Sequence, residues 1–339
     1  MDDRRKIARS LLNFGFGNLA SKLADEAKNA IVFASAAMSD ADLPIGCAKL
    51  GGEPDMHHSI AWPRRLPYSR SEWLVEYHIK EAAQLRSRKR AWAPFLTIEE
   101  QLEAADRHDR LAVRLILEEP LSFIGQFRLE PDMAARSSLE DLPKAGRFLL
   151  FYDAEAQPWG MYPDHSTGFR LIYDDSPDDS VERRKTPDAA IRTFNSAILT
   201  PHDVITALPP DTHRATLAVT TPEEYNHLRD WWFDVYLKQS PHLQCHQLGG
   251  WPDVIQGDMQ EKVQYVSHGI ALTGSDAYDE GRRRGLAAGA DDWVLLLQIC
   301  SDEAAGMMWG DDGYLYVWIR KQDLKDRRFE KSRHVLQCY

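Results

Sequence analysis

Hydrophobic and polar positions follow two different periods along the chain, and the helical period comes first. Residues 4 to about 36 carry apolar side chains at a roughly helical spacing, which Gly15 and Gly17 interrupt. We therefore expect two short helices in this segment. A second helical pattern begins near Ser71 and stops before Pro94.

Two further segments contain helix-start signals. Thr97-Ile-Glu-Glu100 has the form of a capping box, in which the Thr oxygen and the Glu side chain each bind a free backbone amide. Thr221-Pro-Glu-Glu224 has the same form with proline in the first turn, and Tyr225 to Tyr236 then place apolar side chains on one face. Each signal predicts the start of a helix.

Strand patterns occupy other parts of the chain. Leu121–Leu129 alternates apolar and polar side chains, which predicts a half-buried strand, and Gly125 within it predicts a bulge or a close backbone approach. Nearly continuous apolar runs of strand length predict central strands that are covered on both faces. These runs are Arg147–Tyr152, Phe169–Tyr173, Trp293–Ile299 and Tyr314–Ile319.

The strand segments occur in the same order twice. Both halves contain two adjacent glycines, a nearby proline and then a glutamine within an apolar strand. These residues are Gly51, Gly52, Pro54 and Gln126 in the first half, and Gly249, Gly250, Pro252 and Gln298 in the second. The interval from second glycine to glutamine is 74 residues in the first half and 48 in the second, and the surplus falls in the helical segment at about 70–118. A surface insertion of this kind costs little closure entropy.

This order of elements predicts an α+β fold. We expect a pseudo-duplicated, mostly antiparallel β-sheet core with flanking helices and a helical insertion in the first half. The expected organisation is an N-terminal helical segment over 1–42, a first half over 43–200 with its insertion at about 70–118, and a linking helix with the second half over 201–339. The two halves are expected to form one compact body.

The glycine-rich loops are interpreted first as structure. Adjacent glycines permit positive φ and proline then fixes φ, which suits a loop that turns sharply against a flat side chain. A buried amide must be hydrogen-bonded, so we expect Gln126 and Gln298 to tie the neighbouring loops to the sheet. The tryptophan near each loop is interpreted as a buried cap on the turn. The alternative is a platform that receives a peptide strand from a partner.

Composition narrows the class of protein. The chain has 339 residues, of which 43% are hydrophobic and 27% charged, and a formal net charge of −11, as in a globular protein that repels nucleic acid. The first residues fit neither an export signal nor a membrane span, so we expect a cytoplasmic protein without membrane contact. The acidic clusters are interpreted as solvated surface, or alternatively as a face that meets a basic protein.

Candidate reactive groups are few. The four cysteines are widely spaced and lack a C-x-x-C pair, so we expect buried thiols rather than disulfides or a zinc site. His242, Cys245 and His246 were weighed as a metal site or a cysteine nucleophile, but a second ligand pair is missing. Asp302, Asp311 and Asp312 could hold a cation, but a plain turn fits their spacing better. We expect no catalytic residue, metal or cofactor.

Several motifs together resemble a known family. They include K-L-G-G-x-P at Lys49, F-I-G-Q at Phe123, L-G-G-W-P-D-V-I-Q-G-D-M at Leu248 and M-M-W-G-D-D-G-Y-L-Y-V-W-I at Met307. From about residue 43 to the end, the chain resembles the bacterial YwqG family, whose function is unknown. Residues 70 to 118 depart from the typical shorter member.

The resemblance implies a protein-binding role. The family is similar to the programmed cell death 2 proteins, which escort a ribosomal protein, and it occurs beside bacterial toxin genes, where members are implicated in neutralisation. The zinc-binding cysteine pairs of the eukaryotic proteins are missing here. The family-like positions expected to line a partner surface are Trp62, Trp251, Asp253, Gln256, Asp258, Trp309 and Asp311.

We therefore expect a non-enzymatic protein-binding protein. The first hypothesis is an immunity protein whose acidic face meets a basic toxin. The second is a chaperone-like escort that holds an extended client segment at a sheet edge. The third is an enzyme, which would require a deep pocket with convergent titratable groups.

Overall fold

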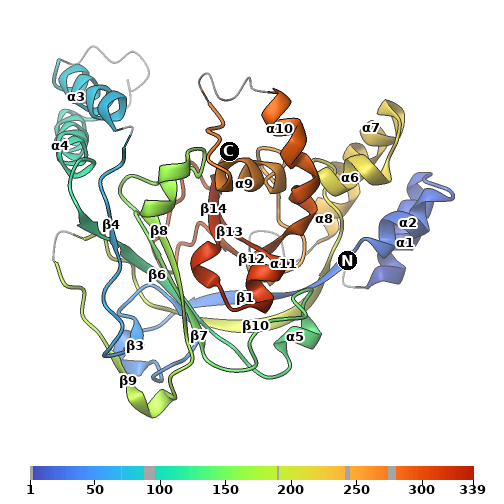
Figure 1. Cartoon of the computed structure of the whole chain (residues 1–339), viewed down its shortest axis with the longest axis horizontal. Coiled ribbons are helices and arrows are strands. Elements are labelled where there is room, and N and C mark those ends of the chain that lie inside the picture. The colour runs from blue at the N-terminus through green and yellow to red at the C-terminus, as the bar shows by residue number, and fades with distance from the viewer. Residues whose placement is uncertain (1–2, 70, 88–95, 189–190, 241–244, 274–279) are drawn as a thin grey trace.

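The computed structural model describes residues 3–69, 71–87, 96–188, 191–240, 245–273 and 280–339, and within them the main sheet has ten antiparallel strands (Figure 1). The strand order is β14-β13-β12-β11-β1-β10-β2-β6-β7-β8. The strands are β1 Lys28–Ala37, β2 Lys49–Leu50, β6 Ser122–Arg128, β7 Arg147–Tyr152, β8 Phe169–Asp174, β10 Ala197–Thr206, β11 His246–Gly249, β12 Trp293–Cys300, β13 Tyr314–Arg320 and β14 Arg333–Gln337. Two small sheets pair β3 Asp55–His57 with β9 Val181–Arg183 and β4 Arg64–Arg65 with β5 Glu119–Pro120. The mixed α+β class is confirmed.

Helices flank this sheet at several places. Figure 1 shows α3 and α4 standing apart at one end of the molecule, and α1, α2, α6 and α7 at the opposite end. The α-helices are α1 Arg4–Phe14, α2 Leu19–Asp25, α3 Glu72–Arg86, α4 Ile98–Arg114, α5 Met133–Arg136, α6 His213–Ala218, α7 Pro222–Trp231, α8 Leu237–Gln239, α9 Gln260–Ser267, α10 Glu280–Leu286 and α11 Lys321–Lys325. Shorter turns are the 3₁₀ segments η1 Asp40–Asp42, η2 Pro163–Gly168, η3 Asp178–Ser180, η6 Ala287–Asp292 and η7 Phe329–Lys331, and the π-turn η4 Trp232–Tyr236.

The N-terminal segment differs from the expectation in its last third. The two short helices are present as α1 and α2, but Lys28–Ala37 forms β1 in the middle of the sheet rather than more helix. β1 pairs with β10 from Lys28–Thr206 to Ala37–Ala197, and with β11 on its other side. A short apolar run that is buried on both faces has no hydrophobic period that distinguishes a strand from a helix. The sequence pattern therefore did not identify β1 as a strand.

Both predicted capping boxes are confirmed. The Thr97 hydroxyl accepts the Glu100 amide at 3.3 Å, and the Glu100 carboxylate accepts the Thr97 amide at 2.7 Å. Thr221 and Glu224 make the same reciprocal pair at the start of α7. Each box satisfies amides that have no intrahelical partner, so the local sequence alone sets the first residue of these helices.

The predicted strands are present, with two corrections. β6, predicted to be half-buried, lies inside the sheet and has six of its seven residues buried, because both of its faces are covered. β7, β12 and β13 lie inside the sheet and are almost completely buried. Residues 169–173, predicted to be central, belong to β8, which is an edge strand with a half-buried pattern. Phe169 and Leu171 are buried in the central core, whereas Ile172, which packs against a second cluster, and Tyr173 are only partly buried.

The two halves of the sheet are arranged alike about the β1–β10 pair. Outward from this pair, the strands are β2, β6, β7 and β8 on one side and β11, β12, β13 and β14 on the other. The register shifts at Phe123/Gly125 between β6 and β7, as the sequence predicted for Gly125, and at Leu295/Leu297 between β12 and β13. The main core lies where side chains of both halves meet, as in the ring contacts of Tyr152 with Trp309 and with His334.

The two glutamines make matching hydrogen bonds to the two glycine-rich loops. Gln126 accepts the Asp55 amide at 2.8 Å and donates to the Cys47 carbonyl at 2.7 Å and the Asp55 carboxylate at 2.9 Å. Gln298 accepts the Asp253 amide at 2.9 Å and donates to the Cys245 carbonyl at 3.2 Å and the Asp253 carboxylate at 3.0 Å. Both amides therefore fasten a loop to its strand, in equivalent positions.

Candidate binding site

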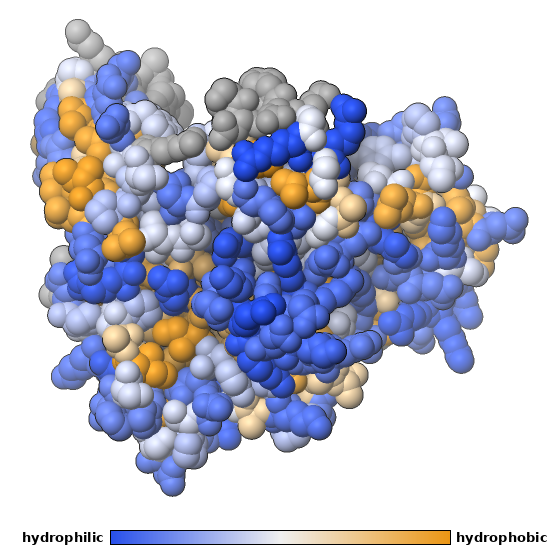
Figure 2. All heavy atoms as spheres, viewed as in Figure 1, coloured by the Kyte–Doolittle hydropathy of each residue, from blue (hydrophilic) through white to orange (hydrophobic). Residues whose placement is uncertain are grey.

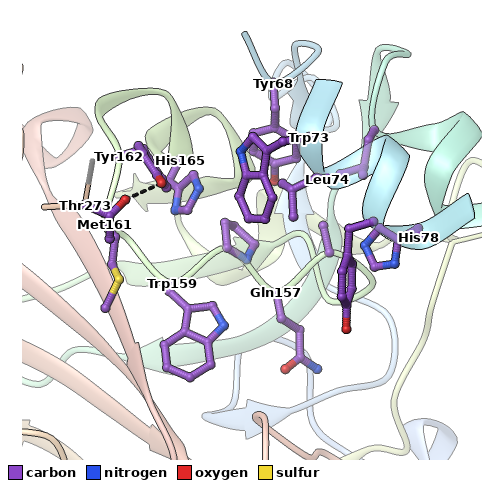
Figure 3. Close-up of a pocket in the computed structure, with 14 residues that line it drawn as sticks. Tyr68, Trp73, Leu74, His78, Gln157, Trp159, Met161, Tyr162, His165 and Thr273 are labelled. Carbon is purple, nitrogen blue, oxygen red and sulfur yellow. Dashed lines mark hydrogen bonds between the residues drawn. The ribbon is translucent and has the colours of Figure 1, made fainter. Parts of the chain in front are cut away.

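An aromatic-lined pocket lies between the first turns of α3 and the loop that follows β7 (Figure 3). It encloses about 330 Å³. Figure 3 shows Trp73 extending from α3 toward the loop that carries Trp159 and His165. Its lining is dominated by aromatic rings and includes Tyr68, Trp73, Leu74, Tyr77, His78, Leu115, Ala156, Gln157, Pro158, Trp159, Met161, Tyr162, His165 and Thr273. Apolar pockets of this size are typical of binding sites for a side chain or a small ligand.

Arg65 fixes the base of the helical hairpin, α3 with α4, against the sheet. Its side chain is 2% exposed and donates to Asp153, just after β7, at 2.6 Å. The same guanidinium donates to the carbonyls of Arg114 at 2.7 Å and Leu117 at 2.9 Å, at the end of α4. A cation beside these carbonyls also interacts favourably with the negative end of the helix dipole. Arg65 therefore sets the place where the hairpin leaves the body.

Tyr68 extends this network into the pocket wall. Its hydroxyl donates to Asp153 at 3.0 Å, and its ring lies beneath the Arg65 guanidinium at 4.8 Å. Burial, and next the Asp153 charge, raise the pKa of Tyr68 well above its ordinary value. Tyr68 is therefore a neutral hydrogen-bond donor whose polar atom is already committed to Asp153.

The opposite wall is held by contacts to the second half of the chain. Gln157, at φ 44°, accepts the Gly310 amide at 2.8 Å and donates to the Met308 carbonyl at 3.0 Å. The Pro158 carbonyl accepts hydrogen bonds from Tyr152 at 2.8 Å and His334 at 2.9 Å. Because this loop is bonded on both sides, the pocket wall is a rigid part of the body.

The two pocket histidines are neutral at pH 7. Burial lowers the pKa of His165 to about 4, and burial together with the neighbouring His108 lowers the pKa of His78 to about 4. The Nδ1 atom of His165 accepts the Gly160 amide at 3.1 Å, so its Nε2 carries the proton. Among the described residues no partner accepts that proton, which leaves one directed donor beside the rings.

The tryptophans predicted to line a partner surface lie elsewhere and serve packing. Trp251 is 3% exposed, its indole donates to the Glu26 carbonyl at 2.7 Å, and the Lys28 ammonium lies 3.3 Å from the ring centroid. Trp309 is fully buried and donates to the Cys300 carbonyl at 3.2 Å. Trp62 is half-buried, packs against Phe151 and donates to the Leu121 carbonyl at 2.9 Å.

The polar members of that predicted set make hydrogen bonds within the protein. Asp253 binds Gln298, and the exposed Gln256 donates its amide to Gln337 at 2.9 Å. Asp258 accepts the amides of His213 at 2.6 Å and Glu261 at 2.8 Å. Asp311 is exposed, and its carbonyl accepts the Tyr339 amide at 3.1 Å. Asp253, Gln256 and Asp258 share the loop between β11 and α9, and the role of all four residues in partner binding stays a prediction.

A serine, an aspartate and a histidine meet where β1 and β12 end and β11 begins. Ser35 donates to Asp302, and the Nε2 atom of His246 lies 3.1 Å from the same carboxylate oxygen. Burial would raise the pKa of Asp302, but the hydrogen bonds from His246 and Ser35 outweigh it and lower that pKa to about 2. Nucleophilic catalysis requires the imidazole to accept the serine proton, whereas here both groups donate to the carboxylate. The arrangement is a structural link between strands.

Neither a metal nor a thiol centre emerges. Within the described part of the chain, no cluster of three or more His, Cys, Asp or Glu side chains could hold a metal ion. His242, considered and set aside as a metal ligand with Cys245 and His246, lies outside the described residues. Burial raises the pKa of the Cys300 thiol well above its ordinary value, as expected of an inert buried cysteine.

The comparisons place the chain in a family. The model of a domain of unknown function, DUF1963, matches residues 48–338. The chain belongs to the DUF1963 family. Among curated proteins, none matches the chain. The DUF1963 match includes both glutamine-anchored loops and the α3–α4 hairpin, while α1, α2 and β1 precede it. No helix in the described ranges is both long and apolar enough to cross a membrane.

The pocket residues were not singled out from the sequence. Trp73 and Tyr77 are one helical turn apart in α3, and both remain about half exposed. Two aromatic rings at that spacing on the exposed side of a helix could have indicated a binding site, because large aromatic residues usually pack into a core. Trp159 and His165 gave no such signal, since they reach the pocket through the path of a loop.

Proposed function

We propose that this protein is a non-enzymatic binding protein that receives an apolar or aromatic side chain of a partner polypeptide in the pocket between α3 and the loop after β7. The observation that carries the proposal is a preformed, ring-lined pocket of about 330 Å³ with two large exposed aromatics, Trp73 and Tyr77, at its rim. Aromatic anchors that enter such pockets dominate the affinity of many protein interfaces.

The chemistry of the pocket favours binding over catalysis. Its described lining includes no carboxylate, lysine or cysteine, and its two histidines have pKa values of about 4. A general base is most effective when its pKa lies near the working pH, and these imidazoles fall well below neutrality. The His165 Nε2–H remains as a donor that would orient a neutral acceptor on the bound group.

The proposed scaffold consists of two copies of one unit. Support comes from the equal strand order on either side of the β1–β10 pair, from bulges at equivalent positions and from the matched bonds of Gln126 and Gln298. The pocket lies where a wall from the first half is bonded to a loop of the second, through Gln157. A rigid two-unit body of this kind holds a preformed pocket at little entropic cost.

The finer part of the proposal names the partner as a basic toxin that this protein neutralises. It rests on the resemblance to the YwqG family and on the net charge of −11, which favours encounter with a cationic protein. Neutralisation by binding requires only an affinity higher than that of the toxin's target, which is consistent with a site that lacks reactive groups.

Filling or emptying the pocket tests the proposal. In Ala156→Trp the new ring occupies the pocket, and in Trp73→Ala a rim anchor is lost; we expect affinity for the partner to fall roughly tenfold to a hundredfold in each. The measurement is co-expression with a toxin encoded beside the gene, followed by titration calorimetry of the purified pair. Loss of an anchor should also reduce protection of the host cell.

Phe233→Ala is the matched control, because Phe233 is also a half-exposed aromatic but lies in η4, at a distance from the pocket. Its affinity should equal that of the unmodified chain. Wild-type affinity in both pocket variants would contradict the pocket as the binding site. If the partner binds but the host cell is not protected, the toxin hypothesis is contradicted, whereas the pocket remains the proposed binding site.

A further inference from the structure

We propose that two copies of this chain associate through α4, which packs antiparallel against α4 of the second copy about a two-fold axis. The proposal is independent of the pocket, whose rim is formed by Trp73 and Tyr77 of α3. It rests on three features of the hairpin: a small internal core, an exposed apolar side and a charge distribution that is complementary to itself.

The hairpin buries little of its apolar surface by itself. The cluster between its helices consists of Ala82, Leu85 and Ala105, with Ala104 partly buried beside it. Figure 2 shows hydrophobic side chains gathered on the outer surface of α3 and α4. The exposed ones include Ile79 at 54%, Ile98 at 53%, Leu102 at 47%, Val113 at 59%, Ile116 at 55% and Leu117 at 46%. Patches of this kind on an otherwise polar surface mark interaction sites.

The exposed apolar residues of α4 form one stripe. Ile98, Leu102 and Val113 are separated by 4 and 11 positions, which at 3.6 residues per turn places them on one side of the helix, and Ile116 follows just after its end. The buried Ala105 and Ala112 mark the side that faces α3. The stripe therefore lies beside the contact with α3, where a second helix can pack.

Charges are distributed unequally along the same helix. Glu99, Glu100 and Glu103 lie in the first two turns, whereas Arg107, Arg110 and Arg114 lie in the second half. Arg86 of α3 binds both acids in the middle of the helix, Asp106 at 2.7 Å and Asp109 at 2.6 Å, and so offsets part of their charge. α4 therefore has an acidic first part and a basic last part.

A groove beside the basic part matches the acidic part. It encloses about 650 Å³ and is lined by three arginines, two acids and two apolar residues: Arg107, Arg110, Arg114, Asp109, Glu155, Leu111 and Val113. The start of α4 presents carboxylates at Glu99 and Glu103 with Leu102 between them. Acidic and apolar side chains of one copy thus fit a basic and apolar groove of the other.

Two-fold symmetry pairs the acidic part of each α4 with the basic part of the other. In an antiparallel pair centred near Asp106, Glu103 of one copy faces Arg110 of the other, and Glu99 faces Arg114, which also binds Glu119 of its own copy at 3.1 Å. These residues lie on matching flanks of the two helices, so every contact occurs twice. A parallel pair would instead place like charges together.

Charge reversal tests the pairing without disturbing the fold, since Glu103 and Arg110 are exposed. The mass of the full chain is measured by light scattering after size exclusion and by sedimentation equilibrium. We expect a species of twice 38.7 kDa for the unmodified chain. Glu103→Arg alone and Arg110→Glu alone should each raise the dimer dissociation constant about tenfold or more, because each reversal creates two like-charge contacts.

The decisive result comes from recombination. An equimolar mixture of the two single variants should form a heterodimer, since every facing pair is then of opposite charge, and the double variant Glu103→Arg/Arg110→Glu should regain the dimer. Glu223→Arg on α7 is the control and should not change the mass. A monomeric unmodified chain, or single variants that dimerise as tightly as the unmodified chain, would overturn the proposal. So would a mixture that stays monomeric.

Discussion

At the residue scale, two buried amides and two glycine pairs define how the loops meet the sheet. Gly250 has φ 75°, and a Cβ at that position would lie 2.6 Å from the Cβ of Ala30, so only glycine fits between the loop and β1. Gly52 has φ 65°, and its Cβ would lie 2.2 Å from the Asp40 carboxylate. The sequence predicted the need for positive φ, but the close neighbours come from distant segments.

Gln298→Leu should reveal what the buried amide contributes. The leucine has a similar size, but it leaves the Asp253 amide, the Asp253 carboxylate and the Cys245 carbonyl without their partner. We expect the free energy of unfolding in urea to fall by about 2–4 kcal/mol, and Gln126→Leu to have a similar effect. Gln322→Leu on the surface serves as control and should change it by less than about 0.5 kcal/mol. Equal stability of Gln298→Leu and the control would contradict the role given to this residue.

At the element scale, the α3–α4 hairpin is joined to the body mainly at its base. Its internal core is small, and its position depends on a buried ion pair with additional hydrogen bonds to backbone carbonyls. The capping box of Thr97 shows that the start of α4 is set locally, whereas the direction of the hairpin is set by Arg65 in β4. The pocket exists only because that direction brings α3 over the loop after β7.

Arg65→Met should loosen the hairpin while the rest of the sheet stays folded. The variant leaves the Asp153 carboxylate buried without its cation and two carbonyls of α4 without a donor. Removing one partner of a buried pair typically costs roughly 3–5 kcal/mol. Hydrogen exchange measured by mass spectrometry should therefore become faster at the end of α4 and in the first turns of α3.

Arg64→Met provides the control for this experiment. Arg64 is the preceding residue and pairs with Glu118, but both side chains are about half exposed. Exposed ion pairs contribute little, so exchange in the hairpin should remain as in the unmodified chain. If both variants exchanged alike, the hairpin would not depend on Arg65.

At the scale of the whole molecule, the two ends of the sheet meet through histidines that are held neutral. His334 is 3% exposed, packs against Phe169 and Tyr152, and donates to the Pro158 carbonyl. Burial, and next the neighbouring His165, lower the pKa of His334 to about 3. Burial lowers the pKa of His165 to about 4. The contact between the halves therefore holds the imidazoles of His165 and His334 in their uncharged form.

Acid should weaken this contact before it protonates the carboxylates. The unfolded chain binds protons at histidine near pH 6.5, whereas folded His165 and His334 bind them only near pH 4 and 3. Between those limits the unfolded state holds more protons, so stability falls as pH falls. From pH 7.5 to 5 each residue should remove up to about 2 kcal/mol, read from urea unfolding at the two pH values. His334→Gln, which keeps a donor but does not titrate, should show a shallower pH dependence; an unchanged slope would contradict this cause.

The predictions from sequence succeeded where the physical cause is local. Thr97 and Thr221 predict the starts of α4 and α7, because a cap binds amides within the same turn. The alternation around Gly125 predicts a strand with a bulge. β1 was missed and β8 was placed too far inside the sheet, because burial on two faces depends on neighbours that no window of sequence contains. Trp251 and Trp309 were expected at a partner surface for the same reason, and the fold buries both.

The sequence by itself determined the α+β class, the capped helix starts, the apolar strands and the glycine–glutamine loops, because each depends on the period or the chemistry of adjacent residues. Tertiary structure alone decided that β1 joins the two halves, that Arg65 directs the hairpin, and that Trp73, Trp159 and His165 surround one pocket. These residues are far apart along the chain, and only the packing of the sheet and hairpin brings them within contact distance.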